Sequence, residues 1–232
     1  MSRTHSDSQK TKINKSMLYR TLLVFVPFLI LSTLFGYLAN EVVEGETMAT
    51  DHYLLGAIQA ISNPVTDVIL KQATVFGGVL MVLLFLLVLE IFLLQTKKWR
   101  WALFAALSVG GVLVINSVLK LLFERDRPYI YNLVLESTYS FPSGHAALSM
   151  ALALTIIAIA WKTSWRKIAI VVGMVYVLLI GFSRLYLTVH YPTDVLAGWI
   201  LASLWVLLVF SMMHWSIDRY IKPRQHSAER NE

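Results

Sequence analysis

The sequence predicts an all-α, polytopic membrane protein with six transmembrane helices and short amphipathic interfacial helices between the first and the second. Hydrophobic residues make up 57% of the 232 residues, and the mean hydropathy is +0.64. Charged residues make up only 15%, whereas soluble domains carry about a quarter. Together with six long apolar stretches and basic residues gathered in the segments between them, this composition favours a membrane protein over a soluble one.

Each apolar stretch is long enough to cross a hydrocarbon core of about 30 Å, which requires about 20 helical residues. In lipid the backbone polar groups have to bond within the segment, so a spanning stretch is helical. The six predicted helices cover residues 18–39, 74–95, 101–123, 144–161, 168–187 and 194–215. They form one domain, 18–215, between two polar segments, 1–17 and 216–232, which are predicted to be cytoplasmic tails.

The segment 51–72 is apolar but is interrupted by Asn63 and Pro64. Its apolar residues recur with helical periodicity on both sides of the break, and each half is too short to span a bilayer. We therefore expect two short amphipathic helices in the membrane interface. A simple extramembrane loop is the alternative.

The distribution of basic residues predicts the orientation in the membrane. Of the 20 lysines and arginines, 15 fall in the segments 1–20, 96–100, 162–167 and 216–232. The segment 40–72 instead has five acids and one base. By the positive-inside rule both termini are cytoplasmic, in the inner membrane of a bacterial cell. Because the bases are scattered over short loops, no nucleic-acid partner is expected.

Five bases remain on the predicted outer side, against this rule: Lys71, Lys120, Arg125, Arg127 and Arg184. Four of them gather at the outer ends of the third and fifth predicted helices, which suggests that they bind an anion. The chain has no cysteine, which excludes thiol nucleophiles and cysteine-ligated metals.

Lys120 and Arg127 are seven residues apart, about two helical turns, so both are expected on one helix face that ends near Pro128. There the bidentate guanidinium of Arg127 and the ammonium group of Lys120 can bind a phosphate. Arg125 and Asp126 are expected to pair with each other or to steer headgroups. The alternative for the whole segment is snorkelling of the cations to lipid headgroups.

A second group, Pro142-Ser143-Gly144-His145, opens the fourth predicted helix. Ser143 is a candidate N-cap, and Gly144 allows close approach of the backbone to a ligand. Free N–H groups at a helix start bind anions, and His145 beside them can donate a proton. An ordinary capped helix start with an incidental histidine is the alternative.

A third group runs from Ser183-Arg184 to His190 and Asp194, with Pro192 at the first position of the sixth helix. A carboxylate four residues after a histidine can hold one ring nitrogen protonated and leave the other free to attack. The alternative is a helix-capping aspartate near an interfacial histidine.

Together, the three groups resemble the three-part signature of the type 2 phosphatidic acid phosphatase (PAP2) superfamily, K-x6-RP, PSGH and SR-x5-H-x3-D, without a gap or substitution. The resemblance covers about residues 51–215. It implies a phosphatase without metal or other cofactor, with His190 as the nucleophile that forms a phosphohistidine and Asp194 orienting it. It implies that His145 protonates the leaving group and activates water. The phosphate ligands it implies are Lys120, Arg127, Ser143, Gly144 and Arg184.

The expected substrate is a membrane lipid with a phosphate or pyrophosphate headgroup at the outer leaflet, first undecaprenyl pyrophosphate, then phosphatidylglycerophosphate or phosphatidic acid. A lipid phosphotransferase that uses the same phosphohistidine, and a lipid transporter with a vestigial site, are the alternatives. His52, Glu90 and Asn116 receive no firm role, except that Asn116 lies one turn from Lys120 and is a candidate to support it. The oligomeric state is not predicted.

Overall fold

The structure is a computed structural model that describes residues 3–128, 134 and 136–228. All regular secondary structure in these residues is helical. The helices are α1 (Arg3–Glu44), α2 (Met48–Gln59), α3 (Pro64–Val75), α4 (Val79–Gln95), α5 (Trp99–Phe123), α6 (Gly144–Ala160), α7 (Arg166–Tyr186) and α8 (Pro192–Ala228). The predicted all-α class is confirmed.

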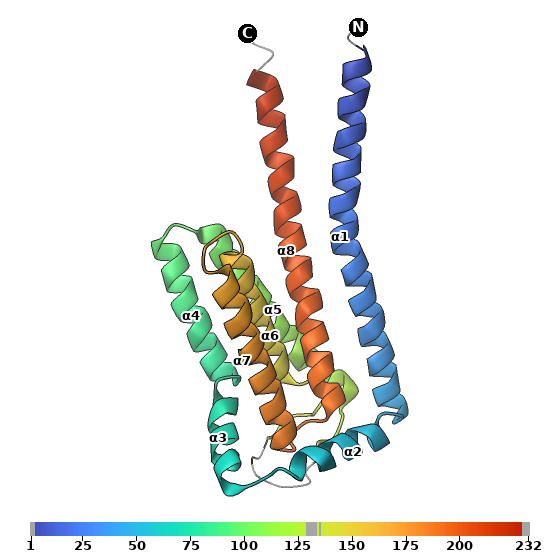
Figure 1. Cartoon of the computed structure of the whole chain (residues 1–232), viewed down its shortest axis with the longest axis vertical. Helices are drawn as coiled ribbons and strands as arrows, with labels where there is room; N and C mark the ends of the chain where they lie inside the picture. Colours follow the sequence, from blue (N-terminus) through green and yellow to red (C-terminus); the bar gives the residue numbers. More distant parts are fainter. Residues whose placement is uncertain (1–2, 129–133, 135, 229–232) are drawn as a thin grey trace.

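The helices form a bundle with α6 at its centre, packed against α5, α7 and α8. Helix α1 packs along α8, and α4 packs on α5 (Figure 1). Both termini and the α4–α5 and α6–α7 connections lie towards one end of the molecule, whereas α2, α3 and the segments that follow α5 and α7 lie at the other (Figure 1). The bundle therefore has two chemically distinct ends, and the three sequence groups meet at the end away from the termini.

Helix α6 occupies the centre because small side chains line it. Ala146, Ala147 and Ala151 are fully buried, and small residues let helix backbones approach closely within a membrane. Gly198 of α8 approaches the backbone of its neighbour, because a Cβ atom there would lie 2.6 Å from the carbonyl oxygen of Ser143. This contact sets the start of α8 directly on the start of α6.

Four helices are long and apolar enough to cross a membrane: Leu22–Glu44 within α1, α5, α7 and Pro192–Met213 within α8. Helices α4 and α6 are apolar but have only 17 residues each. Helices α2 and α3 form a pair bent by 119° that counts as a fifth span if the two are taken together. The structure thus confirms several spanning helices and leaves the count of six as a prediction.

One predicted boundary is wrong. The second predicted helix, 74–95, is divided, because α3 ends at Val75 and α4 begins only at Val79. The break contains Gly77 and Gly78, and glycine is a poor helix former. A Cβ atom on Gly77 would lie 2.4 Å from the side chain of Ile180, so the glycine lets the turn pack tightly against α7.

The region 51–72 is helical on both sides of its break, and the alternative of a simple loop is wrong. The side-chain oxygen of Asn63 accepts hydrogen bonds from the backbone of Val65 and Thr66, and Pro64 takes the first helical position of α3. Helices α1 and α8 run on into the segments that were predicted to be tails. The division into tails and a central domain remains a prediction.

The contact at Gly198 gives a first prediction. Gly198→Ala places a methyl group against a backbone oxygen that cannot move without shifting α6, and overpacking of this kind costs about 1–3 kcal/mol. We expect a lower thermal unfolding midpoint in detergent. Gly110→Ala is the matched control, because a Cβ atom there meets nothing within 4 Å, and alanine favours helix by about 1 kcal/mol. Equal midpoints for the two variants would contradict this account of the packing.

Candidate active site

The predicted site residues come from four helices and two connecting segments that meet at one end of the bundle. Lys120 lies in the last turn of α5, and Arg127 lies in the extended segment that follows. His145 lies in the first turn of α6, and Arg184 in the last turn of α7. His190 lies in the turn between α7 and α8, and Asp194 in the first turn of α8. Residues far apart in sequence thus converge on one region.

The expectation that Lys120 and Arg127 share a helix face is wrong. Helix α5 ends at Phe123, five residues before Pro128, because Glu124 adopts the left-handed conformation (φ 46°, ψ 31°). A left-handed residue at this position is a common helix terminator. Beyond Glu124 the chain is no longer helical. Arg127 therefore reaches the site from a direction that a continued α5 helix would not allow.

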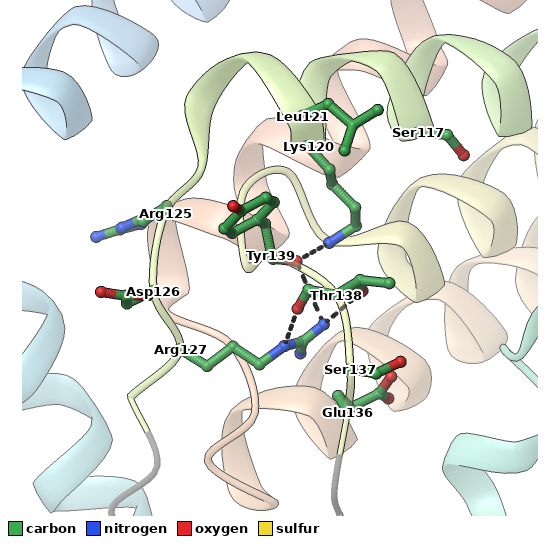
Figure 2. Close-up of a pocket in the computed structure, with 10 residues that line it drawn as sticks. All are labelled: Ser117, Lys120, Leu121, Arg125, Asp126, Arg127, Glu136, Ser137, Thr138 and Tyr139. Atoms are coloured by element: carbon green, nitrogen blue, oxygen red, sulfur yellow. Dashed lines mark hydrogen bonds between the residues drawn. The ribbon is translucent and has the colours of Figure 1, made fainter.

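Both cations nevertheless face one pocket of about 640 Å³. Figure 2 shows Lys120 and Arg127 reaching the loop at Thr138 and Tyr139 from two sides, while Arg125 points away from both. Lys120 Nζ donates to the carbonyl oxygens of Tyr139 and Ser140. Arg127 Nε donates to the Thr138 carbonyl oxygen over 2.7 Å. These bonds fix two positive groups against one loop that lines the pocket.

His190 is almost fully buried, with 1% of its surface exposed. Arg127 Nη1 lies 3.2 Å from its Nε2, and Asp194 Oδ2 lies 3.3 Å from its Nδ1. Because a guanidinium only donates and a carboxylate only accepts, this network assigns the proton to Nδ1 and a lone pair to Nε2. Burial, followed by the positive charges of Arg127 and Arg184, holds the pKa of His190 well below its ordinary value of 6.5.

Asp194 is also buried, and each of its carboxylate oxygens has polar partners. Oδ2 accepts from the Tyr191 backbone N–H at 2.9 Å and from the Ser140 hydroxyl, besides facing His190. Oδ1 accepts from Arg125 Nη1 at 2.5 Å. The expectation that Arg125 pairs with Asp126 or steers headgroups is therefore wrong: its partners are the buried carboxylates Asp194 and Asp51.

Arg184 is 1% exposed. Its Nη1 donates to Thr74 Oγ1 at 2.8 Å, and its Nη2 forms an ion pair with Glu136. Burial raises the pKa of Glu136, but the adjacent Arg184 guanidinium outweighs burial and holds that pKa below its ordinary value. Among the described residues no partner is found for Arg184 Nε.

The start of α6 has features that allow a ligand to approach its backbone closely. Ser143 occupies the N-cap position but its side chain makes no capping bond, and its buried hydroxyl has no partner in the described part of the chain. A Cβ atom on Gly144 would lie 3.2 Å from Asn116 Oδ1. Asn116 Nδ2 donates to the Pro142 carbonyl oxygen at 3.2 Å, so Asn116 supports this loop. His145 lies next to Gly78, where a Cβ atom would be 3.6 Å from its Nε2.

Two buried donors without a described partner, Ser143 Oγ and Arg184 Nε, belong to the residues predicted to bind phosphate. Buried polar groups are nearly always satisfied, so unpaired ones at a cationic site point to a missing anion. Four further residues hold the cluster: Asp51, Arg125, Glu136 and Ser140. Sequence reasoning assigned no role to Asp51, Glu136 and Ser140, and a wrong one to Arg125. Only Arg125 had left a signal, as a base on the predicted outer side.

Apolar helices of membrane-spanning length, together with a buried cationic cluster around a histidine–carboxylate pair, place the chain in the class of membrane-bound phosphatases. It belongs to the PAP2 superfamily, whose family model matches residues 99–218. The matched region contains all three sequence groups, so the resemblance seen in the sequence is confirmed.

Characterised relatives agree with this assignment. The chain is 29% identical to phosphatidylglycerophosphatase B of Bacillus subtilis over 83% of this chain and 94% of the relative. It is 28% identical to an undecaprenyl-diphosphatase of the same organism over 69% of this chain and 82% of the relative. The crystal structure of a transmembrane PAP2-type phosphatidylglycerolphosphate phosphatase from Bacillus subtilis superposes with a TM-score of 0.74 at 28% identity, covering 84% of this chain and 96% of that one. The chain is thus a phosphatase.

The lowered pKa of His190 predicts how stability depends on pH. Below pH 6.5 the unfolded chain binds a proton at His190 that the folded chain does not, so the free energy of unfolding falls as the pH falls towards the lower folded pKa. One such group contributes up to about 1.4 kcal/mol per pH unit. His190→Asn should therefore flatten the dependence of the unfolding free energy on pH between 6.5 and 5. An unchanged slope would contradict the assignment.

Proposed function

We propose that this protein is an integral-membrane lipid phosphatase that removes a phosphate or diphosphate headgroup at the outer leaflet through a phosphohistidine on His190. The observation that carries the proposal is the environment of His190. Its Nδ1 faces Asp194 and its Nε2 faces Arg127, inside a cluster of cations. A ring nitrogen with a lone pair, directed at a phosphate-binding guanidinium, is suitably placed to attack phosphorus.

In the first step His190 Nε2 bonds to phosphorus while the bond from phosphorus to the leaving oxygen breaks. His145 donates a proton to that oxygen. Asp194 keeps Nδ1 protonated and stabilises the imidazolium form of His190, a role that orienting carboxylates have in other histidine-containing sites. In the second step His145 takes a proton from water, the oxygen of that water bonds to phosphorus, and the N–P bond breaks.

Lys120, Arg127 and Arg184 would bind the phosphate oxygens, together with Ser143 and the backbone at Gly144. Charge that develops on these oxygens is stabilised best by donors that are already in place. Arg127 now donates to His190 Nε2 and to the Val189 carbonyl oxygen. When a phosphate arrives, Arg127 would exchange the contact with Nε2 for a phosphate oxygen, which frees the nucleophile.

The cluster supports a reaction without a metal ion, because cationic side chains occupy the places where a metal-dependent phosphatase needs carboxylates. No cofactor is required by this mechanism. The proton transfers use His145, and the negative charge of the phosphate is met by lysine and arginine.

We further propose six spans, with α4 and α6 as short ones, and with α2 and α3 in the interface. A 17-residue helix is about 25 Å long, within reach of a thinned bilayer. Both termini would be cytoplasmic, which places the site on the outer face because it lies at the opposite end of the bundle (Figure 1). A lipid tail would approach sideways along α5, where the pocket is bordered by Leu121, which is 68% exposed.

Undecaprenyl pyrophosphate is our first candidate for the substrate, because an outward site suits recycling of that carrier and one relative is an undecaprenyl-diphosphatase. Phosphatidylglycerophosphate, the substrate class named for another relative, and phosphatidic acid are the further candidates.

Purified protein tests the reaction with undecaprenyl pyrophosphate, phosphatidylglycerophosphate and phosphatidic acid in detergent, with and without EDTA. We expect free phosphate to be released fastest from undecaprenyl pyrophosphate, and at the same rate with and without EDTA.

His190→Asn should lower the rate by at least about 10⁴-fold, as loss of a nucleophile does. Labelled lipid should label the wild-type protein with acid-labile phosphate. Loss of activity in EDTA would refute the metal-free mechanism, and label passing to a second lipid would indicate a transferase.

Orientation is testable because the sequence contains no cysteine. The α1–α2 connection and the α6–α7 connection lie towards opposite ends of the bundle (Figure 1). Glu46 is an exposed residue of the first connection, and Ser164 is an exposed residue of the second. Glu46→Cys should react with a membrane-impermeant maleimide in intact cells, and Ser164→Cys only after permeabilisation. The reverse pattern would place the site on the cytoplasmic side.

A further inference from the structure

Arg125 is a buried cation held between two carboxylates from distant elements. Its side chain is 8% exposed, and those of Asp51 on α2 and Asp194 on α8 are 1% and 0% exposed. Arg125 Nη2 lies 2.8 Å from Asp51 Oδ2, and Arg125 Nη1 lies 2.5 Å from Asp194 Oδ1. Helix α2 lies outside the matched family region. The guanidinium of Arg125 thus connects it to Asp194, the carboxylate beside the proposed nucleophile His190.

Asp51 does more than neutralise Arg125. Its Oδ2 accepts the Thr193 hydroxyl at 2.6 Å, and its Oδ1 accepts the Thr193 backbone N–H at 3.2 Å. Thr193 lies in the first turn of α8, where backbone N–H groups lack helical partners and a negative charge is favourable. Asp51 therefore binds both Arg125 and the helix start that carries Asp194.

Arg125 in turn constrains the orientation of the Asp194 carboxylate. The guanidinium uses Oδ1, which leaves Oδ2 for His190, Ser140 and the Tyr191 N–H. The guanidinium carbon also lies 4.2 Å from the centre of the Tyr191 ring, an attractive cation–π arrangement that fixes its plane. Both terminal nitrogens of the Arg125 guanidinium have carboxylate partners, and its face packs on the Tyr191 ring. The side chain therefore has little conformational freedom, and the Asp194 carboxylate that it binds has little as well.

Building on the proposed function, we propose that Asp51 and Arg125 are positioning residues, linked as Asp51–Arg125–Asp194–His190, through which α2 aligns the nucleophile. Neither residue binds the phosphate in this arrangement: Asp51 is an anion, and Arg125 is turned away from Lys120 and Arg127 (Figure 2). The link acts on the chemical step, because it sets the direction of Asp194 and through it the orientation of the imidazole.

The test is steady-state kinetics of full-length Asp51→Asn with undecaprenyl pyrophosphate in detergent. Asparagine keeps the shape of the side chain and removes its charge. We expect kcat to fall about 10- to 100-fold, the range seen when a supporting partner of a reactive group is lost, with KM changed less than about twofold. Asp51→Glu, which restores the charge, should recover most of kcat.

Asp67→Asn is the matched control for general loosening of the α2–α3 pair. Asp67 accepts hydrogen bonds from the Tyr186 hydroxyl at 2.7 Å and from Ser62 at 3.0 Å, away from Asp194. We expect it to lower the unfolding midpoint and to retain wild-type kcat. If Asp51→Asn keeps wild-type kcat, or if Asp67→Asn loses as much, the positioning role is wrong.

A double-variant cycle tests the link itself. If Asp51 and Arg125 act through one link, then the double variant Asp51→Asn/Arg125→Gln should lose clearly less kcat than the product of the two single losses. Multiplicative losses would overturn the link. The parent proposal fails separately, if wild-type protein releases no phosphate from any of the lipids or if His190→Asn stays active.

Discussion

The structure of the active-site end depends on keeping one buried carboxylate, that of Asp194, ionised and pointing in one direction. A carboxylate removed from water is stable as an anion only if charge and hydrogen bonds replace its hydration. Arg125, Ser140 and the Tyr191 backbone N–H supply that replacement. Each of them constrains the chain: α5 has to end early so that Arg125 can reach Asp194, and α2 has to lie across the bundle so that Asp51 can balance Arg125.

A second constraint is the placement of cations at the end of apolar helices. Arg184 and Arg127 are almost fully buried, which is unfavourable unless oxygen acceptors surround them. Glu136, Thr74 and carbonyl oxygens at Thr138 and Val189 provide those acceptors. The donors left over, Ser143 Oγ and Arg184 Nε, lie among the residues proposed to receive phosphate. The scaffold therefore holds the cations in place before substrate binds, so little reorganisation is needed during the reaction.

The residues proposed for catalysis come from the part of the chain that the family model matches. The histidine–carboxylate pair and the cations lie on α5, α6, α7, α8 and the segments that connect them, within the region shared with the superfamily. The pocket is lined on α5 by Ser117, Lys120 and Leu121, and relatives of similar sequence are named for different lipid substrates. Helix α2, which lies before the matched region, contacts Arg125 and the start of α8 through Asp51.

The sequence by itself determined the all-α membrane class, the approximate limits of most apolar helices, the helical character of 51–72 and the superfamily, because these follow from local composition, periodicity and short motifs. It also pointed to the residues that meet at one end of the bundle, because bases on the predicted outer side marked Lys120, Arg127 and Arg184, and the motifs marked His145, His190 and Asp194. Only the tertiary structure decided that α5 ends at Phe123, that Gly77 and Gly78 separate α3 from α4, and that Arg125 binds Asp51 and Asp194. Those features depend on contacts between residues far apart along the chain, such as Asp51 and Thr193, which are 142 positions apart, and no local pattern encodes such contacts.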